Sequence, residues 1–364
     1  MKIHLNSKIP RSGYLMTPPK NISILGSTGS VGTQALEVIR ASRGRLKVTS
    51  LAAGENIDLL EKQIREFEPG KAYVKKLSDR EKLKRKYKDL NVCDDIEEVA
   101  ADKEAQVVLS AISGRNAIPA TLESLRLGKT VALAQKEVLV EEGEEVRKIC
   151  KQSGAQIIPV DSEHSAIFQS IGREKSSSIE EIILTCSGGP FFRKKRKDLK
   201  NITPEQALAH PKWNMGKKIS IDSATLMNKA LELIEAVFLF NVPAEKIRVL
   251  IHPEAKIHSG VVFQDGNVIF TAGATDMKIP IAYALYFPER VKNNFPRIDF
   301  SRLQSWNFYP PDEETFPSLK LARKALEMGG KSCADLNQTN DKAVELFLEK
   351  EISFLEIFEM LNFK

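Results

Sequence analysis

Short apolar runs alternate with amphipathic stretches through the first 160 residues of the chain. The runs are apolar at consecutive positions, a pattern typical of strands that a parallel sheet buries on both faces. Six strands are predicted, at 22–25, 46–53, 71–74, 105–112, 130–134 and 156–160. The stretches between them carry apolar residues at helical spacing, as expected of helices that cover such a sheet. We therefore predict an α/β protein in which residues 21–160 form a Rossmann-like parallel-sheet domain.

After residue 160 the pattern changes to β-like segments separated by longer loops. These segments lie at 180–185, 247–251, 257–263 and 267–272. Asp265-Gly266, between the last two, is a hairpin signal. Residues 187–218 show no clear periodicity, and an irregular stretch of that length inside a compact protein is typically a functional lid. We predict an α+β catalytic and dimerisation domain with a lid loop over residues 161–300.

Two helical regions complete the prediction. One helix is expected from Thr225 to Leu239, with Ser223 at its start. The other region follows a linker at 301–315 and has the spacing of several short helices, so residues 316–364 are predicted to form a small C-terminal helical bundle.

The composition fits a globular protein of several domains, with 364 residues, 42% hydrophobic and 28% charged. The net charge is +6, and the densest basic run, Arg193 to Lys200, has no interleaved aromatic residues, so no nucleic-acid partner is expected. No apolar run is long enough for a membrane span. The four cysteines are widely spaced, which indicates reduced thiols in a cytoplasmic protein. Residues 1–20 lack the apolar core of a secretory signal and are interpreted as an N-terminal extension.

A glycine-rich turn follows the first predicted strand and opens the first predicted helix. Gly26 permits the tight turn, Gly29 allows a pyrophosphate to approach the backbone, and Gly32 allows helix and strand to touch. The spacing indicates a dinucleotide site, although an ordinary strand-to-helix turn is the alternative. At the end of the second strand, Glu55 would bind a free ribose 2′-hydroxyl and repel a 2′-phosphate, which favours NAD over NADP. A nearby Arg or Lys could offset it.

Two carboxylates, Asp161 and Glu163, follow the sixth strand directly. Ligands bind at this edge of open α/β sheets, and carboxylates two residues apart repel one another unless a cation lies between them. Oxygen ligands suit Mg²⁺ or Mn²⁺, and Glu232 could supply a third ligand. The alternative is a helix N-cap at Asp161 or Ser162 with Glu163 in the first turn.

The segment from His210 to Glu232 is rich in polar groups of several kinds. Asn228, Lys229 and Glu232 are three and four apart on the predicted helix, so they share one face. This face could bind an anion with Lys229, Asn228 and Ser223 while Glu232 holds a cation. The alternative is an ordinary Lys–Glu pair on a solvated face.

Three further features complete the candidate chemistry. Ser187-Gly-Gly offers backbone N–H groups that suit phosphate oxygens, and Lys136 follows another strand end. His252 and His258 have no metal-ligand spacing and are interpreted as structural, whereas His164 is expected to pack against or orient a neighbour.

Six segments together resemble one enzyme family, the 1-deoxy-D-xylulose-5-phosphate reductoisomerases. They are GSTGSVG (26–32), LAQKE (133–137), PVDSEHSAIFQ (159–169), CSGGPF (186–191), HPKWNMGKKISIDSATLMNKALE (210–232) and IHPEAKIHSGVVFQDG (251–266). The resemblance implies an NADPH-dependent homodimer that also needs Mg²⁺, Mn²⁺ or Co²⁺. It implies that 1-deoxy-D-xylulose 5-phosphate, a small phosphorylated sugar, is rearranged and reduced to 2-C-methyl-D-erythritol 4-phosphate for isoprenoid biosynthesis.

The resemblance also implies roles for individual residues. The implied metal ligands are Asp161, Glu163 and Glu232, and the implied catalytic residues are Lys136, Glu163, His210 and Glu232. The implied substrate-binding residues are Lys136, Ser162, Glu163, Ser187, His210, Trp213 on the lid, Ser223, Asn228, Lys229 and Glu232. The implied cofactor contacts are Gly26, Thr28, Gly29, Ser30, Val31, Gly54, Glu55, Asn56, Gln135, Glu137 and Gly216.

The chain departs from the family pattern at two positions. The family often has Asn at Gln135 and a basic residue at Glu55. Two other functions are weighed against the reductoisomerase: a Rossmann-type NAD(P)-dependent dehydrogenase that does not rearrange its substrate, and a non-catalytic nucleotide sensor. The carboxylates Asp161, Glu163 and Glu232 discriminate, because simple hydride transfer needs no metal cage.

Overall fold

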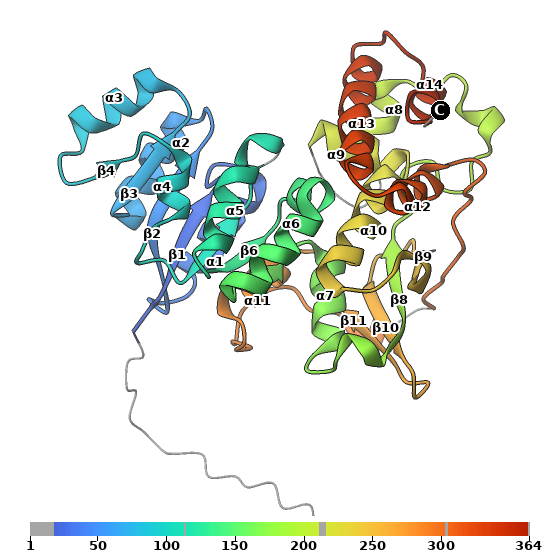
Figure 1. The fold of residues 1–364 in the computed structure, drawn as a ribbon, viewed down its shortest axis with the longest axis horizontal. Coiled ribbons are helices and arrows are strands. Elements are labelled where there is room, and N and C mark those ends of the chain that lie inside the picture. The colour runs from blue at the N-terminus through green and yellow to red at the C-terminus, as the bar shows by residue number, and fades with distance from the viewer. Residues whose placement is uncertain (1–17, 113, 211–215, 303–304, 363–364) are drawn as a thin grey trace, which may run out of the picture.

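The computed structural model describes residues 18–112, 114–210, 216–302 and 305–362. It contains two β-sheets, and Figure 1 shows the blue-to-green N-terminal sheet on one side and the red C-terminal helices on the other. Within the described ranges, no helix is both long and apolar enough to cross a membrane. Trp213 and most of the predicted extension at 1–20 lie outside the described residues.

The N-terminal sheet is parallel, with the strand order β4-β3-β2-β1-β5-β6-β7. Its strands are β1 (Lys20–Leu25), β2 (Leu46–Ala53), β3 (Lys71–Val74), β4 (Asn91–Val92), β5 (Val107–Ser110), β6 (Thr130–Leu133) and β7 (Gln156–Pro159). The six predicted strands are confirmed, and β4, with two residues, is too short to leave a pattern. The strand order reverses beside β1, the point where open α/β sheets bind ligands.

Helices cover both faces of this sheet. The helices that connect successive strands are α1 (Ser30–Arg40), α2 (Ile57–Phe67), α3 (Leu77–Lys86), α4 (Ile96–Ala100), α5 (Ile118–Arg126) and α6 (Glu137–Ser153). One apolar core joins the sheet to α1 and α2, and another joins it to α4 and α5. The predicted Rossmann-like domain is therefore present as a doubly covered sheet.

The glycine turn between β1 and α1 is fixed by close backbone packing. Gly26 has a positive φ of +92°, and a Cβ atom there would lie 2.5 Å from the carbonyl oxygen of Ala111. A Cβ on Gly32 would lie 2.1 Å from the carbonyl oxygen of Gly26. Both distances are shorter than non-bonded atoms allow, so the turn requires glycine at both positions.

The second sheet has the order β11-β10-β8-β9. Its strands are β8 (Ile179–Cys186), β9 (Ile247–Ile251), β10 (Ile257–Phe263) and β11 (Val268–Ala272). β9 runs parallel to β8, whereas β10 and β11 form an antiparallel hairpin. Gly266 in the connecting turn has a φ of +84°, which confirms the predicted hairpin signal.

The helices of the second half pack on this sheet and on one another. They are α7 (Ser162–Ile171), α8 (Pro204–Leu208), α9 (Lys217–Ala224), α10 (Met227–Phe240), α11 (Lys278–Tyr286), α12 (Ser318–Met328), α13 (Ser332–Leu348) and α14 (Phe354–Met360). One large core joins β8 and β9 to α10 and to the C-terminal helices. Helix α11 instead returns to the N-terminal sheet, where Ile281 and Leu285 are buried beside α1. The predicted domain boundaries remain a prediction.

The expected helix from Thr225 to Leu239 begins later than predicted. Helix α9 ends at Ala224, and Leu226 has a left-handed backbone with a φ of +60°, which separates α9 from α10. Ser223 therefore lies in the last turn of α9 and is not a helix N-cap. A left-handed leucine costs about 1–2 kcal/mol, and burial of Leu226 and Met227 offsets that cost.

The stretch expected to be irregular, residues 187–218, contains more structure than its sequence indicated. It includes a short 3₁₀ helix (Arg196–Leu199), all of α8 and the start of α9. Phe191, Leu199 and Ala207 are buried in the core shared with the C-terminal helices. These buried apolar residues are irregularly spaced along the segment, which explains why its sequence shows no periodic pattern.

Candidate functional site

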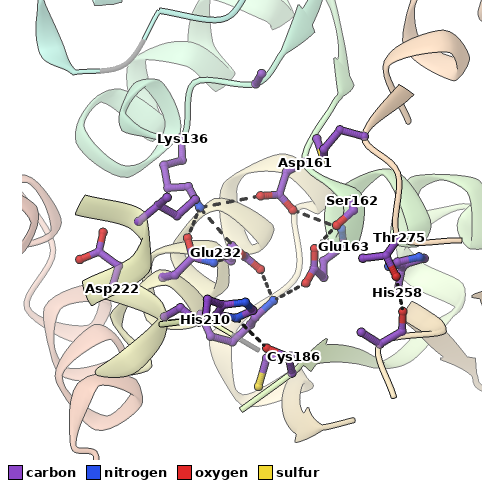
Figure 2. Close-up of a pocket in the computed structure, with 18 of the residues that line it drawn as sticks. Lys136, Asp161, Ser162, Glu163, Cys186, His210, Asp222, Glu232, His258 and Thr275 are labelled. Carbon is purple, nitrogen blue, oxygen red and sulfur yellow. Dashed lines mark hydrogen bonds and ion pairs between the residues drawn. The ribbon is translucent and has the colours of Figure 1, made fainter. Parts of the chain in front are cut away.

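A cavity of about 1040 Å³ lies between the two halves of the molecule. Its walls come from the carboxyl ends of strands in the N-terminal sheet, from α9 and α10, and from residues 255–258 and 274–278 of the second half. Figure 2 shows that side chains from both halves point into this space. The cavity is thus placed at the ligand-binding edge of the parallel sheet.

Three carboxylates meet in the cavity, and we call Asp161, Glu163 and Glu232 the carboxylate cluster. Asp161 caps α7 by accepting a hydrogen bond from the backbone N–H of Glu163 at 3.2 Å. Glu232 comes from α10, on the opposite wall. One oxygen from each carboxylate lies within 4.8 Å of the others. The N-cap predicted as the alternative is present, and it helps to build the cluster.

Two lysines balance part of this negative charge. Lys229 Nζ donates to Glu163 Oε1 at 2.9 Å and also to Glu232. Lys136 Nζ donates to Asn228 Oδ1 at 2.6 Å and lies 3.8 Å from Asp161 and 3.7 Å from Glu232. When all three carboxylates are ionised, they exceed the two ammonium groups by one negative charge.

Burial makes these charges depend on one another. The Glu232 side chain is 2% exposed, and burial together with the Asp161 carboxylate raises its pKa to about 8. Burial disfavours ionised Asp161, but Lys136 and His164 outweigh it and lower the pKa of Asp161 to about 2. Burial would lower the pKa of Lys229, yet Glu163 and Glu232 outweigh it and raise that pKa. A change at one group therefore alters its neighbours.

The cluster fits a divalent cation. Oxygen ligands are those that Mg²⁺ and Mn²⁺ prefer. Three carboxylates at this separation repel one another, and the raised pKa of Glu232 reflects its burial first and that repulsion second. A cation between them would offset it. Asp161 and Glu163 remain partly exposed, at 23% and 21% of their side-chain surface, so the cluster faces the cavity.

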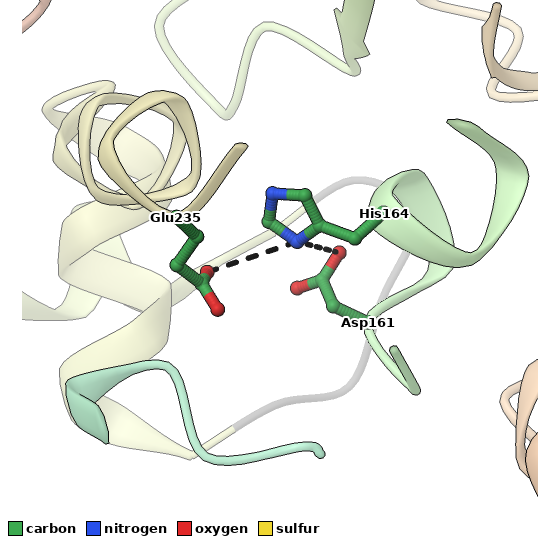
Figure 3. A group of neighbouring side chains, drawn as sticks. All are labelled: Asp161, His164 and Glu235. Carbon is green, nitrogen blue, oxygen red and sulfur yellow. Dashed lines mark ion pairs between the residues drawn. The ribbon is translucent and has the colours of Figure 1, made fainter. Parts of the chain in front are cut away.

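A second trio adjoins the cluster and shares Asp161 with it (Figure 3). His164 Nδ1 lies 3.6 Å from Asp161 and 3.8 Å from Glu235. Its Nε2 hydrogen-bonds the backbone carbonyl of Glu232 at 2.9 Å, so this nitrogen is the donor. His164 and Glu235 are buried and do not line the cavity. His164 thus holds Asp161 and Glu232 in position, as expected of a residue that orients its neighbours.

Hydroxyl and backbone N–H groups gather beside the cluster. Gly188 and Gly189 both have positive φ, and a Cβ on Gly189 would lie 2.6 Å from the carbonyl oxygen of Ser223. The Ser187 turn therefore packs against the end of α9. Ser187 Oγ lies 3.2 Å from His210 Nε2, and burial lowers the pKa of His210. The His210 imidazole and the hydroxyls of Ser187 and Ser223 line the cavity together and supply hydrogen-bonding groups that suit an anion such as phosphate.

Three family descriptions match successive parts of the chain. "1-deoxy-D-xylulose 5-phosphate reductoisomerase" matches residues 22–143, its C-terminal domain matches 157–240, and "DXP reductoisomerase C-terminal domain" matches 272–362.

The chain belongs to the 1-deoxy-D-xylulose 5-phosphate reductoisomerase family.

Family members from several bacteria are similar over nearly their whole length. The reductoisomerase of Thermodesulfovibrio yellowstonii is 48% identical over 94% of this chain and 91% of its own. That of Chlorobaculum tepidum is 47% identical over 93% and 90%. The solved reductoisomerase of Zymomonas mobilis in complex with NADPH has a TM-score of 0.89 at 38% identity, covering 95% of this chain and 90% of its own. A solved reductoisomerase in complex with NADPH, fosmidomycin and magnesium has a TM-score of 0.87, also at 38% identity and covering 95% and 90%.

Most residues implied by the reductoisomerase resemblance line one cavity. From the implied cofactor contacts these are Ser30, Val31, Gln135, Glu137 and Gly216. From the implied substrate, catalytic and metal residues they are Lys136, Asp161, Ser162, Glu163, Ser187, His210, Ser223, Asn228, Lys229 and Glu232. The structure therefore brings together residues from segments that are far apart in the sequence.

The remaining implied cofactor contacts lie away from the cavity lining. They are Gly26, Thr28, Gly29, Gly54, Glu55 and Asn56. Asn56 also has a structural role, because its side chain caps α2 by accepting from the backbone N–H of Leu59 at 3.1 Å. All six follow β1 or β2, where a dinucleotide would extend out of the cavity along the sheet edge.

The structure adds cavity residues that the sequence analysis did not select. His258, interpreted there as structural, lines the cavity with Lys256, Thr275 and Asp276. Their only sequence signal was that the segment containing His258 resembled the family. The loop at 274–278 carried no motif, and its position depends on the return of α11 to the N-terminal sheet.

Proposed function

We propose that this chain is an NADPH- and divalent-metal-dependent enzyme that converts 1-deoxy-D-xylulose 5-phosphate to 2-C-methyl-D-erythritol 4-phosphate, a step of isoprenoid precursor biosynthesis. The observation that carries the proposal is one cavity shared by the dinucleotide edge of a parallel sheet and a three-carboxylate cluster. Similar proteins named 1-deoxy-D-xylulose 5-phosphate reductoisomerase support it, as do solved reductoisomerases in complex with NADPH, and with NADPH, fosmidomycin and magnesium.

The cofactor is assigned to the edge formed by β1, β2 and β6. The glycine turn receives the pyrophosphate, and Ser30, Val31, Gln135, Glu137 and Gly216 contact the nicotinamide half within the cavity. NADPH supplies the hydride when bound, and the protein fixes the distance between that hydride and the substrate carbon. Gln135 is 2% exposed and donates to the Gly114 carbonyl at 2.5 Å, so its position is well defined.

The metal is assigned to Asp161, Glu163 and Glu232. A divalent cation supplies a Lewis acid that stabilises negative charge on substrate oxygens during the rearrangement. Lys136 stays close to Asp161 and Glu232 and can hold a proton or stabilise an oxygen at the same point. Cobalt would suit the same ligands as magnesium or manganese.

The substrate phosphate is assigned to the hydroxyl and amide groups at the end of α9. Ser187 and Ser223 line the cavity there, and Asn228 and Lys229 line it from the first turn of α10, where both also donate hydrogen bonds to Glu232. Binding energy at the phosphate can then position the reacting carbons near the cluster. Ser162 and His210, which line the same cavity, are proposed to contact the carbon chain between the two ends, and Trp213 is proposed to cover it.

Identification of the product tests the proposal. The full-length protein is incubated with 1-deoxy-D-xylulose 5-phosphate, NADPH and Mg²⁺, and the carbon skeleton of the product is determined by NMR. We expect the branched skeleton of 2-C-methyl-D-erythritol 4-phosphate. A reduced but unbranched sugar phosphate would support the alternative, a Rossmann-type dehydrogenase without rearrangement, which the relatives do not favour.

A homodimer is the second part of the proposal. Strand β11 is an edge of the second sheet and exposes Val268, Ile269 and Phe270 by 48%, 46% and 37%. Phe308 is also exposed and stacks on Phe270 with ring centroids 5.9 Å apart. An exposed apolar edge strand is a ready surface for pairing with a second copy.

The dimer is tested by measuring mass in solution. Light scattering after size exclusion should give twice the chain mass for the wild type. Ile269→Glu should shift the protein towards the monomer, whereas Leu127→Glu, at a residue that is 51% exposed on the N-terminal domain, should not. Equal behaviour of the two variants would exclude β11 as the interface.

The cytoplasm is the proposed compartment. All four cysteines are free thiols in the structure, which is typical of proteins in a reducing compartment. Fractionation of the producing cells checks this assignment, and recovery with a membrane or secreted fraction would contradict it.

A further inference from the structure

Glu55 lies where a Rossmann-type sheet reads the adenosine ribose of its cofactor. It follows the end of β2 at Ala53, after Gly54, and it is exposed. A carboxylate at this position hydrogen-bonds a free 2′-hydroxyl and repels a 2′-phosphate. NADPH carries that phosphate. A positive charge must therefore lie within reach of Glu55 if the chain is to prefer NADPH.

Three strand ends meet beside Glu55. Strands β1, β2 and β3 are neighbours in the parallel sheet, with Leu25 paired to Ala52 and Ala53 paired to Val74 (Figure 1). The residues that follow the three strands are GSTGS at 26–30, GEN at 54–56 and KK at 75–76. The positive charges of these three segments thus come from the two lysines. We call residues 54–56 and 75–76 the ribose edge.

The backbone of Lys75 is hydrogen-bonded to the end of β2. Its backbone N–H donates to the carbonyl oxygens of Ala53 at 3.2 Å and Gly54 at 3.1 Å. Adjacent strands are about 4.8 Å apart. The flexible four-carbon side chains of Lys75 and its neighbour Lys76 can therefore reach the space above Glu55.

The two lysines are exposed, and within the described ranges neither takes part in an ion pair. Lysines on the helix that follows are engaged differently, since Lys84 pairs with Asp94 and Lys86 pairs with Glu61. Lys75 and Lys76 are thus the cations at this edge that are available to a ligand.

We propose that Lys75 and Lys76 determine cofactor specificity by binding the 2′-phosphate of NADPH and outweighing the charge of Glu55. This inference rests on the proposed function, because it needs NADPH as the cofactor. Two ammonium groups against one carboxylate leave a net charge of +1 at the ribose edge. NADH has a hydroxyl in place of the phosphate, and Glu55 accepts a hydrogen bond from it.

The test measures cofactor binding without substrate. NADPH or NADH is titrated into the full-length protein, and the fluorescence of the reduced nicotinamide gives each Kd. In the variant with Lys75→Ala and Lys76→Ala, the Kd for NADPH should rise about tenfold, as expected on losing charge-assisted contacts at an exposed site. The Kd for NADH should stay the same.

Lys47→Ala is the matched control. Lys47 is an exposed lysine on the same strand, β2, but at its amino end. This variant should leave both Kd values unchanged. Thermal unfolding of every variant verifies that the surface substitutions preserve the fold.

Glu55→Gln should act in the opposite sense. It removes the repulsion of the phosphate and weakens the hydrogen bond to the hydroxyl, so NADPH binding should tighten and NADH binding should weaken, each by a few-fold. The inference is overturned if the double lysine variant weakens both cofactors equally or leaves NADPH binding unchanged. Wild-type protein that binds neither cofactor would contradict the proposed function itself, which separates the two failures.

Discussion

The carboxylate cluster with its two neighbouring lysines, and the ribose edge, both combine lysine with glutamate, but in opposite environments. In the cluster, the Glu232 side chain is 2% exposed, and the neighbouring Lys229, 4% exposed, donates a hydrogen bond to it. At the ribose edge, Glu55, Lys75 and Lys76 are all exposed. Charges in the buried cluster interact strongly, whereas water screens those at the edge.

The difference teaches what each region can contribute. Mutually dependent buried charges can hold a cation and stabilise charge during the reaction. Exposed charges change an affinity by a modest factor, which is enough to choose between two cofactors that differ by one phosphate. We therefore expect substitutions in the cluster to abolish turnover and those at the edge to shift preference.

Glu232→Gln should have the largest effect. It removes one proposed metal ligand, and the several kcal/mol that a catalytic metal supplies correspond to a loss of about a thousandfold in kcat. Steady-state NADPH oxidation measures the loss. Glu245→Gln, the same change at an exposed residue just beyond α10, should have no effect. Similar losses in both variants would remove the metal-binding role from Glu232.

Gly32→Ala should come next, because the cofactor end depends on backbone packing as well as on charge. The added Cβ would lie 2.1 Å from the Gly26 carbonyl oxygen, so the glycine turn must shift. We expect a loss of roughly 1–3 kcal/mol of stability from overpacking and weaker binding of both NADPH and NADH. Calorimetry and cofactor titration measure the two effects.

Gly70→Ala is the control for this change. Its added Cβ would lie 3.7 Å from the Thr49 carbonyl oxygen, an ordinary contact. If Gly32→Ala weakened the binding of NADPH but not that of NADH, the glycine turn would be the part that recognises the 2′-phosphate. The assignment of the 2′-phosphate to the ribose edge would then be wrong.

Asn340→Ala should have a smaller effect, transmitted from the C-terminal helices. Asn340 on α13 donates to Asp222 on α9 at 2.7 Å, and Lys218 also pairs with Asp222 at 2.8 Å. Loss of a buried hydrogen bond costs about 1–3 kcal/mol of stability. Because α9 carries Ser223, we expect KM for the sugar phosphate to rise more than kcat falls.

The exposed Lys342→Ala, on the same helix, serves as the comparison for Asn340→Ala. It should change neither the melting temperature nor KM. A fall in kcat without a rise in KM for Asn340→Ala would show that α9 serves the chemistry and not substrate binding.

Salt should have the smallest effect and should separate the two regions directly. Raising the ionic strength to about 0.3 M shortens the screening length to below 8 Å. The ratio of the Kd values for NADH and NADPH should then fall by a few-fold. An unchanged ratio would mean that the 2′-phosphate is read at a buried site rather than at the ribose edge.

The sequence predicted most of the fold, because strands buried on both faces must be apolar throughout. In β2, for example, the last six residues are all buried, and the bounds of the strand were predicted to the residue. The break at Leu226 was not predictable, because a leucine in left-handed backbone has no local signal and is held there by the surrounding core. The return of α11 to the N-terminal sheet was missed for a similar reason, since it depends on contacts distant in sequence.

The sequence could predict those site residues that directly follow a strand or that share one face of a helix. Asp161 and Glu163 follow a strand, and Asn228, Lys229 and Glu232 share a helix face. Only the tertiary structure shows that Lys229 pairs with Glu163 across the cavity and that His258 lines it. They bring α10 next to α7 and place the start of β10 at the cavity, and no local pattern connects these elements.

Turnover of chelated and metal-restored enzyme tests the central claim most directly. NADPH oxidation with 1-deoxy-D-xylulose 5-phosphate is followed after removal of divalent ions with excess chelator and again after addition of Mg²⁺ or Mn²⁺. The carboxylate cluster predicts that turnover is lost on chelation, restored in the wild type by either ion, and not restored in Glu232→Gln. Undiminished turnover in excess chelator would contradict the account.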